Sequence, residues 1–285
     1  MPKEPGPRVS FYGVRGSTPC SSDRLRRYGG NTSCVVVERD GMAPIVLDMG
    51  TGLREFGARW GNDSAIDASI LVTHLHWDHV QGLPFFGPVH HPNSNVQIYG
   101  PPHDGQDMLA SFDGLMQPPY FPICCDQLPK GIGFHTAWDE GHVIGEAKVT
   151  TRAVPHTGET NGYRIEIDGY VIAYASDHQE PIDDPTKVDS GVLELCDGAD
   201  LVIHDAQFTP AELAARPDWG HCTPSYALEV AAQSGAKQLC MFHHDPWHDD
   251  DMVDELLADC VEEARDRGLD GVIAAAEGMT IEFGA

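Results

Sequence analysis

Short runs of apolar and β-branched residues recur along the chain, separated by glycine, proline and charged residues. Runs of this kind are typical of β-strands that bury most of their side chains. They predict strands at residues 9–12, 34–38, 44–48, 69–73, 96–99, 146–154, 163–167, 171–175, 201–204, 238–242 and 279–283.

Longer stretches between these runs have the composition and end signals of helices. Residues 224–234 have Thr223 as a predicted N-cap, Pro224 at the first helical position and Gly235 beyond their end. The stretch 249–267 opens with acidic residues, which suit the positive end of a helix dipole. The patterns predict helices at 52–60, 107–116, 224–234 and 249–267.

The order of these elements indicates the fold class. Strands dominate the first part of the chain and are mixed with helices later, without a regular alternation of strand and helix. This order predicts an α+β fold, in which two sheets pack on each other with helices outside. We expect one domain over residues 1–285. Residues 101–134, rich in Pro, Gly and aromatic side chains, are expected to form an insertion or flap near a functional site.

The composition narrows the choice of partners. The chain has 44 Asp and Glu against 18 Lys and Arg, a formal net charge of −26. Because Lys and Arg supply most of the affinity for phosphate backbones, a long nucleic acid is not an expected partner. An acidic surface also stays hydrated in concentrated salt, so a high-salt habitat is one hypothesis.

The sequence shows no targeting signal and no pattern of paired cysteines. Residues 1–7 lack the basic start and apolar run of a signal peptide, and no stretch is apolar enough for a membrane span. We therefore expect a cytoplasmic protein without a membrane partner. The eight cysteines show no paired spacing and are expected to be free thiols.

One loop concentrates ligand-type side chains. Residues 73–79 read Thr-His-Leu-His-Trp-Asp-His and follow a predicted buried strand. Imidazoles and carboxylates are the usual ligands of zinc and similar divalent metals. Because the chain must turn at the end of the strand, His74 and His76 can hold one metal while Asp78 and His79 hold a second. The cluster predicts a metal site that hydrolyses its substrate with activated water.

Further ligand-type residues stand just after other predicted strands. His156, Asp177 and the pair His243 and His244 each follow an apolar run. Because the ends of strands collect functional groups on a rigid scaffold, we expect these side chains to complete the site.

The motif His-x-His-x-Asp-His, followed by a strand-end His, a strand-end Asp and a late His, resembles the metallo-β-lactamase-fold hydrolases. Residues 14–19 and 27–34 resemble the branch that holds ribonuclease Z-like and cyclic-phosphodiesterase-like proteins. Residues 48–52 resemble the Asp-x-Gly turn before the first helix of that fold. The resemblance, which runs from about Val9 to the end, implies a four-layer αββα sandwich with a dinuclear site at one edge.

The resemblance also implies roles for single residues. Two divalent ions, Zn²⁺ first and Mn²⁺ or Fe²⁺ as alternatives, would hold a bridging hydroxide as the nucleophile. Their implied ligands are His74, His76 and His156 for the first metal, Asp78, His79 and His243 for the second, and Asp177 between them, with His244 as the alternative to His243.

Asp205 and His221 resemble a carboxylate–histidine pair of the same branch. A carboxylate can orient an imidazole and raise its pKa, so that the ring serves as a general acid beside the catalytic Asp78. The alternative is that His221 only packs near the helix that begins at Pro224.

Asp48 and Arg15, which precede the metal motif, have two interpretations each. Asp48 is expected to accept a hydrogen bond from a ligand histidine, or else to be a simple turn residue. Arg15 and Asn31 lie in a loop that the family places near the site. Arg15 is expected either to clamp a phosphate oxygen or to lie on the surface.

The leading functional hypothesis is a metal-dependent phosphodiesterase that acts on small cyclic or nucleotide diesters. A β-lactam, lactone or thioester hydrolase with the same site is the alternative. A ribonuclease Z-like endonuclease is less expected, because residues 101–134 offer only Lys130 as a basic side chain. The related di-iron oxygen reductases carry Glu where His76 stands, so a redox protein is disfavoured. The resemblance alone suggests a homodimer.

Overall fold

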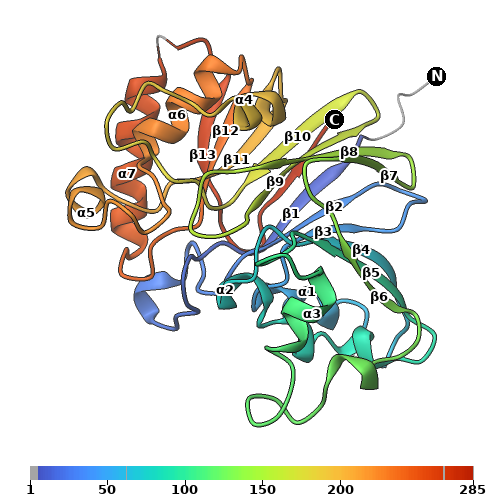
Figure 1. Ribbon diagram of the computed structural model, residues 1–285. Coiled ribbons are helices and arrows are strands. Elements are labelled where there is room, and N and C mark those ends of the chain that lie inside the picture. The colour runs from blue at the N-terminus through green and yellow to red at the C-terminus, as the bar shows by residue number, and fades with distance from the viewer. Residues whose placement is uncertain (1–5, 62, 266, 285) are drawn as a thin grey trace.

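Two seven-stranded sheets pack face to face in the computed structural model, which describes residues 6–61, 63–265 and 267–284 (Figure 1). Residues 1–5, part of the stretch 1–7 that was tested for signal-peptide features, lie outside these ranges. No helix of the described residues is long and apolar enough to cross a membrane. All eight cysteines are unpaired, and six of them are buried.

The first sheet has the order β14-β1-β2-β3-β4-β5-β6. Its first four strands pair antiparallel, and the pairs from β3 to β6 are parallel. Every residue of β2 and β3 is buried, as their apolar composition requires. The strands are β1 Arg8–Gly13, β2 Cys34–Glu38, β3 Ile45–Leu47, β4 Asp67–Leu71, β5 Asn95–Gly100, β6 Ile132–Thr136 and β14 Thr280–Glu282.

The second sheet has the order β13-β12-β11-β10-β9-β8-β7. Strands β7 to β10 pair antiparallel, and β10 to β13 pair parallel. The parallel strands end at one edge of the sheet, which later carries the candidate site. The strands are β7 Gly141–Ile144, β8 Ala147–Ala153, β9 Asn161–Ile167, β10 Tyr170–Ala175, β11 Leu201–Asp205, β12 Gln238–Phe242 and β13 Gly271–Ala274.

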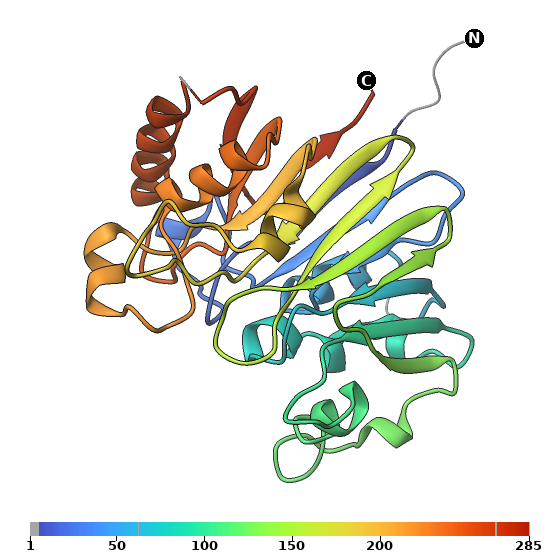
Figure 2. The same cartoon turned by 45° about the horizontal axis from the view of Figure 1, so that its top comes forward.

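Helices cover the outer faces of both sheets (Figures 1 and 2). In α6, Thr223 caps the amide of Tyr226 and Pro224 occupies the first turn, as predicted. In α7, Asp249 is the N-cap and two acidic residues follow it. The helices that lie against the first sheet are α1 Gly52–Ala58 and α3 Met108–Asp113. Those that lie against the second sheet are α4 Ser190–Cys196, α6 Pro224–Gln233 and α7 Asp250–Ala264. Two further helices are short, α2 Trp77–Val80 and α5 Pro210–Ala215.

Three apolar cores separate the layers. The central core lies between the sheets and contains Phe11, Tyr163 and Phe242, which are almost fully buried. A second core joins the first sheet to α1 and α3, and a third joins the second sheet to α4, α6 and α7. The arrangement confirms the predicted α+β class and the four-layer αββα sandwich.

The predictions missed some elements and overextended others. Strands β6 and β7 lie at sheet edges and are half-exposed, so they lack a continuous apolar run. Strand β13 and helices α2, α4 and α5 were also not predicted. The predicted helices at 52–60, 107–116 and 249–267 are shorter in the structure. Residues 101–134 are not wholly irregular, since they contain α3 and a 3-10 turn at Cys125–Gln127 and lead into β6.

Candidate metal centre

The candidate ligands meet where strands of both sheets end. Strand β8 runs parallel to β10, because both pair antiparallel with β9. His156, Asp177 and His243 therefore follow β8, β10 and β12 at one edge of the second sheet. The loop after β4 brings His74 to the same place, and the short helix α2 adds two further ligands.

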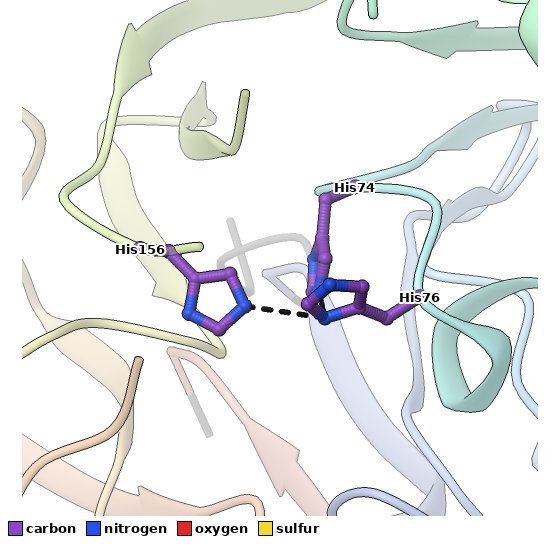
Figure 3. A group of neighbouring side chains, drawn as sticks. All are labelled: His74, His76 and His156. Atoms are coloured by element: carbon purple, nitrogen blue, oxygen red, sulfur yellow. Dashed lines mark hydrogen bonds between the residues drawn. The ribbon is translucent and has the colours of Figure 1, made fainter. Parts of the chain in front are cut away.

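The first group consists of three imidazoles, shown in Figure 3. The Nε2 atom of His74 lies 2.8 Å from Nδ1 of His76, and Nε2 of His156 lies 3.3 Å from the same atom. The side chains of His74 and His156 are buried, whereas His76 is exposed. A zinc–nitrogen bond of about 2.1 Å would place ligand nitrogens roughly 3.3 Å apart, so these spacings suit one shared cation.

The second group consists of two imidazoles and a carboxylate. Oδ2 of Asp78 lies 3.0 Å from Nε2 of His243 and 3.2 Å from Nε2 of His79. The two imidazole nitrogens are themselves 3.2 Å apart. All three side chains are buried.

Asp177 lies between the two groups and offers one oxygen to each. Its Oδ2 atom lies 3.8 Å from Nε2 of His74 and 3.7 Å from Nε2 of His156. Its Oδ1 atom lies 3.1 Å from Nε2 of His79 and 3.5 Å from Nε2 of His243. The structure therefore brings all seven sequence-predicted metal ligands into one cluster.

The positions of the ring protons fit a metal site. Nδ1 of His79 lies 2.8 Å from Oδ2 of Asp48, and Nδ1 of His156 lies 2.7 Å from the carbonyl oxygen of Gly220. Both oxygens only accept hydrogen bonds, so in the neutral rings Nδ1 carries the proton and Nε2 presents its lone pair. These lone pairs face other ring nitrogens and the Asp177 carboxylate. A divalent cation among them would turn that repulsion into coordination, and the donor set suits such an ion.

Burial and charge set the protonation of the cluster. Burial lowers the pKa of His74 well below its ordinary value and that of His156 to about 4, so both rings stay neutral. Burial alone would raise the pKa of Asp177, but the neighbouring imidazoles His243 and His79 hold it well below its usual range. Burial disfavours the His79 cation, yet Asp78, Asp177 and Asp48 together raise its pKa. The negative potential that raises it also attracts a divalent metal ion.

Asp48 is held in place by several hydrogen bonds. It accepts them from the backbone amide of Thr73 at 2.7 Å, from His79 at 2.8 Å and from the hydroxyl of Tyr174 at 2.8 Å. Its φ of +61° lies in the left-handed region that side chains rarely adopt. The predicted hydrogen bond to a ligand histidine is present, and Asp48 fixes the orientation of that ring.

His243, rather than His244, joins the cluster. Nε2 of His244 donates to the carbonyl oxygen of Ala275 at 2.9 Å, and burial lowers the pKa of this ring to about 3. His243 has a φ of +59°, an uncommon conformation that turns its side chain toward the cluster. A Cβ atom on Gly16 would overlap the His243 ring, so a glycine is needed there.

His221 and Asp205 form a buried pair beside the cluster. Nδ1 of His221 lies 2.9 Å from Oδ2 of Asp205 and 3.8 Å from Oδ2 of Asp177. Burial lowers the pKa of His221, but the carboxylates of Asp205, Asp177 and Asp78, with Asp205 first among them, together raise it above the ordinary value. His221 also lines a hollow together with Ser17, His76 and other residues of the cluster.

Arg15 corrects both of the roles expected for it. Arg15 is fully buried, and its guanidinium donates to the carbonyl oxygens of Gly29, Asp245 and His248 at 2.7–3.0 Å. It therefore neither clamps a phosphate nor lies on the surface, and instead connects the loops that carry these carbonyl groups. The side-chain amide of Asn31 donates to Glu277 at 3.0 Å.

Sequence reasoning missed two backbone contributions. The amide of Ser17 donates to Oδ2 of Asp78 at 2.7 Å, from a residue with a φ of +62°. The carbonyl of Gly220 orients His156, and a Cβ atom on this glycine would overlap that ring. A Gly-Ser and a Gly-His pair were the only signals in the sequence, and neither is specific.

Comparison with known proteins assigns the family. A model described as "Beta-lactamase superfamily domain" matches residues 45–244, which include all seven clustered residues. The chain belongs to the beta-lactamase superfamily. Members of this hydrolase superfamily bind divalent metals, in agreement with the His and Asp groups described above.

Individual relatives agree with this assignment. A ribonuclease Z of Haloarcula marismortui is 26% identical over an alignment of 320 positions, which covers 97% of each chain. The structure of the metallo-beta-lactamase fold protein YhfI from Bacillus subtilis has a TM-score of 0.72 and 18% identity, and the match covers 98% of this chain and 100% of that one. A diphosphatase of the PhnP family has a TM-score of 0.68 and 20% identity, with coverage of 97% and 98%. At these identities the two structures show the shared fold.

Proposed function

We propose that the protein is a phosphodiesterase that uses two divalent metal ions to hydrolyse small cyclic or nucleotide diesters. The observation that carries the proposal is the position of Asp177, whose two oxygens face two different groups of ligands. A hollow lined by His221 opens beside these groups. Ligands and a candidate acid therefore surround one space that a substrate can enter.

Seven residues would hold the metals. His74, His76 and His156 would bind the first ion, Asp78, His79 and His243 the second, and Asp177 both. Bound there, two cations supply a nucleophile from water near neutral pH and offset the charge that develops on phosphorus oxygens. Zn²⁺ fits this donor set best, and Mn²⁺ and Fe²⁺ share it.

His221 would donate a proton to the leaving oxygen. Its Nδ1–H donates to Oδ2 of Asp205, 2.9 Å from Nδ1, so the opposite nitrogen, Nε2, is the one free to meet a substrate. Asp205 is itself fixed by the backbone amides of His178 at 3.2 Å and Gln207 at 2.9 Å. The pair thus keeps a protonated ring in a fixed orientation beside the bond that breaks.

A specific observation favours a second candidate, a ribonuclease Z-like endonuclease. The relative from Haloarcula marismortui, named ribonuclease Z, matches over almost the whole of both chains. The net charge of −26 argues against a long RNA, because polyanions need basic side chains for affinity. A small diester is broken by the same chemistry without that requirement.

Turnover of a substrate panel tests the proposal. The metal-analysed protein is assayed with bis(p-nitrophenyl) phosphate, a precursor tRNA, nitrocefin and a homoserine lactone, with added Zn²⁺ or Mn²⁺. We expect metal-dependent hydrolysis of the small diester, abolished by a chelator and restored by metal. Turnover of the tRNA alone would favour the endonuclease, and turnover of the carbonyl substrates alone would move the assignment to acyl chemistry.

A further inference from the structure

An apolar pocket adjoins the candidate metal centre on the side of α2 and α3. Its volume is about 520 Å³, within the range of small-ligand sites. The buried side chains of Phe112 and Met116 line it, and Phe85 and Phe121 meet edge to face across 6.0 Å. We call this site, lined chiefly by Trp77, Phe85, Phe112, Leu115, Tyr120 and Phe121, the aromatic pocket.

The aromatic pocket exposes an unusual amount of aromatic surface. Trp77 is 71% exposed, Phe85 63% and Tyr120 80%. None of the residues lining this pocket carries a charge, although the chain as a whole has a net charge of −26. Apolar rings left in water are unfavourable, and clustered exposed ones mark a binding site.

Two residues connect the aromatic pocket to the metal centre. Trp77, which stands between His76 and Asp78 in the sequence, lines both this pocket and the hollow of the metal centre. Leu115 lines the aromatic pocket and also a smaller hollow that borders His74 and His76. A substrate held at the metal centre can therefore reach the aromatic pocket with an attached group.

We propose that the aromatic pocket binds a flat aromatic group, of the nucleobase type, carried by the phosphodiester. This inference rests on the proposed function. Stacking of a base on aromatic side chains is strong and tolerates any base, because each has a π-face. The amide of Gln81 and the hydroxyl of Tyr120 offer hydrogen bonds to the polar edge of such a ring.

The shape of the site favours a small ligand over a second copy of the chain. An interface between copies needs about 800 Å² of buried surface on each partner, whereas these side chains enclose a concave space beside the metal centre. The aromatic pocket is also continuous with that centre through Trp77. Self-association through this face is the competing outcome of the test.

The decisive experiment compares two five-membered cyclic diesters, only one of which carries a base. Adenosine 2′,3′-cyclic phosphate and glycerol 1,2-cyclic phosphate present the same type of bond, and their hydrolysis is followed by phosphorus NMR. We expect kcat/KM to favour the adenosine compound by about fivefold or more in the wild type. Phe85→Ala and Tyr120→Ala, two exposed positions, should each reduce this preference. Trp247→Ala, at an 83% exposed tryptophan outside the pocket, is the matched control and should keep it.

A binding measurement separates failure of the aromatic pocket from failure of the proposed function. Calorimetry gives the Kd of adenosine 5′-monophosphate and of ribose 5-phosphate for each variant. If no diester is hydrolysed, the phosphodiesterase proposal fails, and weaker binding of the nucleotide alone in Phe85→Ala still supports the pocket. The pocket proposal would be overturned if wild type and variants preferred the adenosine diester equally, or bound adenosine 5′-monophosphate with equal affinity. It would also be overturned by a wild-type dimer, seen by sedimentation, that Phe85→Ala converts to monomer.

Discussion

Asp177 has the largest single effect that we expect from one residue, because each of its carboxylate oxygens faces a different group of ligands. Asp177→Ala should reduce bound metal from about two ions per chain toward none, and should lower kcat/KM on a diester by more than about 100-fold. Elemental analysis after dialysis measures the first effect and bis(p-nitrophenyl) phosphate turnover the second.

The matched control for this variant is Asp183→Asn, which removes a charge from an exposed position six residues along the chain. It should keep both the metal content and the activity of the wild type. Full metal occupancy in Asp177→Ala would contradict the shared-carboxylate arrangement.

Asp205 should set the alkaline limit of activity. Burial lowers the pKa of His221, but Asp205, together with Asp177 and Asp78, raises it above the ordinary value, so the ring stays protonated to a higher pH than an ordinary histidine. A general acid must be protonated, so activity falls as the pH rises through this pKa. Asp205→Asn removes the largest of the raising effects, and the alkaline limb of the kcat/KM profile should move to lower pH.

His221→Asn is the companion variant, since it removes the titrating ring itself. This variant should lose the alkaline limb and most of the activity, while its metal content stays near that of the wild type. An alkaline limb that is unchanged in Asp205→Asn would assign the limb to another group.

At the scale of elements, the loop between α5 and α6 positions a candidate ligand through its backbone. Gly220 has a φ of +91°, and a Cβ atom there would overlap the His156 ring. We expect Gly220→Ala to displace His156, and so to lower metal content and activity as well as stability. Metal analysis and thermal unfolding measure the two effects separately.

Gly169 offers a control for backbone strain alone. Its φ is +81° in the turn between β9 and β10, but an added Cβ atom would meet nothing within 4 Å. Gly169→Ala should cost about 1–2 kcal/mol from the left-handed conformation and leave the metal content unchanged. Equal metal loss in both variants would show that strain, not the collision with His156, is responsible.

Arg15 joins segments that are distant in the sequence. Its guanidinium donates to three carbonyl oxygens in the loops around Gly29 and Asp245. Arg15→Met would leave these carbonyls without their donor, and each unsatisfied buried group costs about 1–3 kcal/mol. We expect the free energy of unfolding to fall by about 3 kcal/mol or more in urea titrations. Arg26→Met, at an exposed ion pair, should change it by less than about 1 kcal/mol.

These elements show why the sequence predicted the clustered ligands but not the residues that hold them in place. His156, Asp177 and His243 follow apolar runs, and strand ends are readable from such runs. The buried state of Arg15 depends on loops more than 200 residues apart in sequence, and no local pattern reports it. The role of Gly220 depends on a backbone carbonyl, for which the sequence gives no specific signal. The edge strands β6 and β7 were not predicted, because half-exposed strands mix apolar and polar residues.

For the whole molecule, the acidic charge has consequences beyond the choice of substrate. A net charge of −26 on 285 residues makes the folded state repel itself, and the repulsion is greatest at low ionic strength. The same field repels polyanions, whereas a small diester carries little charge and can be neutralised at a metal centre. The four-layer sandwich places that centre at one edge, where the cations would locally reverse the sign of the field.

Salt should therefore stabilise the fold. The Debye length falls from about 10 Å at 0.1 M salt to about 3 Å at 1 M, so screening removes most of the repulsion in this range. We expect the Tm, measured by calorimetry in KCl, to rise steeply up to several tenths molar and to level off above about 1 M. Sucrose, which stabilises folded proteins without screening charge, should give a gradual rise instead. A Tm that is independent of KCl, or that rises linearly to high concentration, would show that repulsion among the acidic side chains does not limit the stability of this fold.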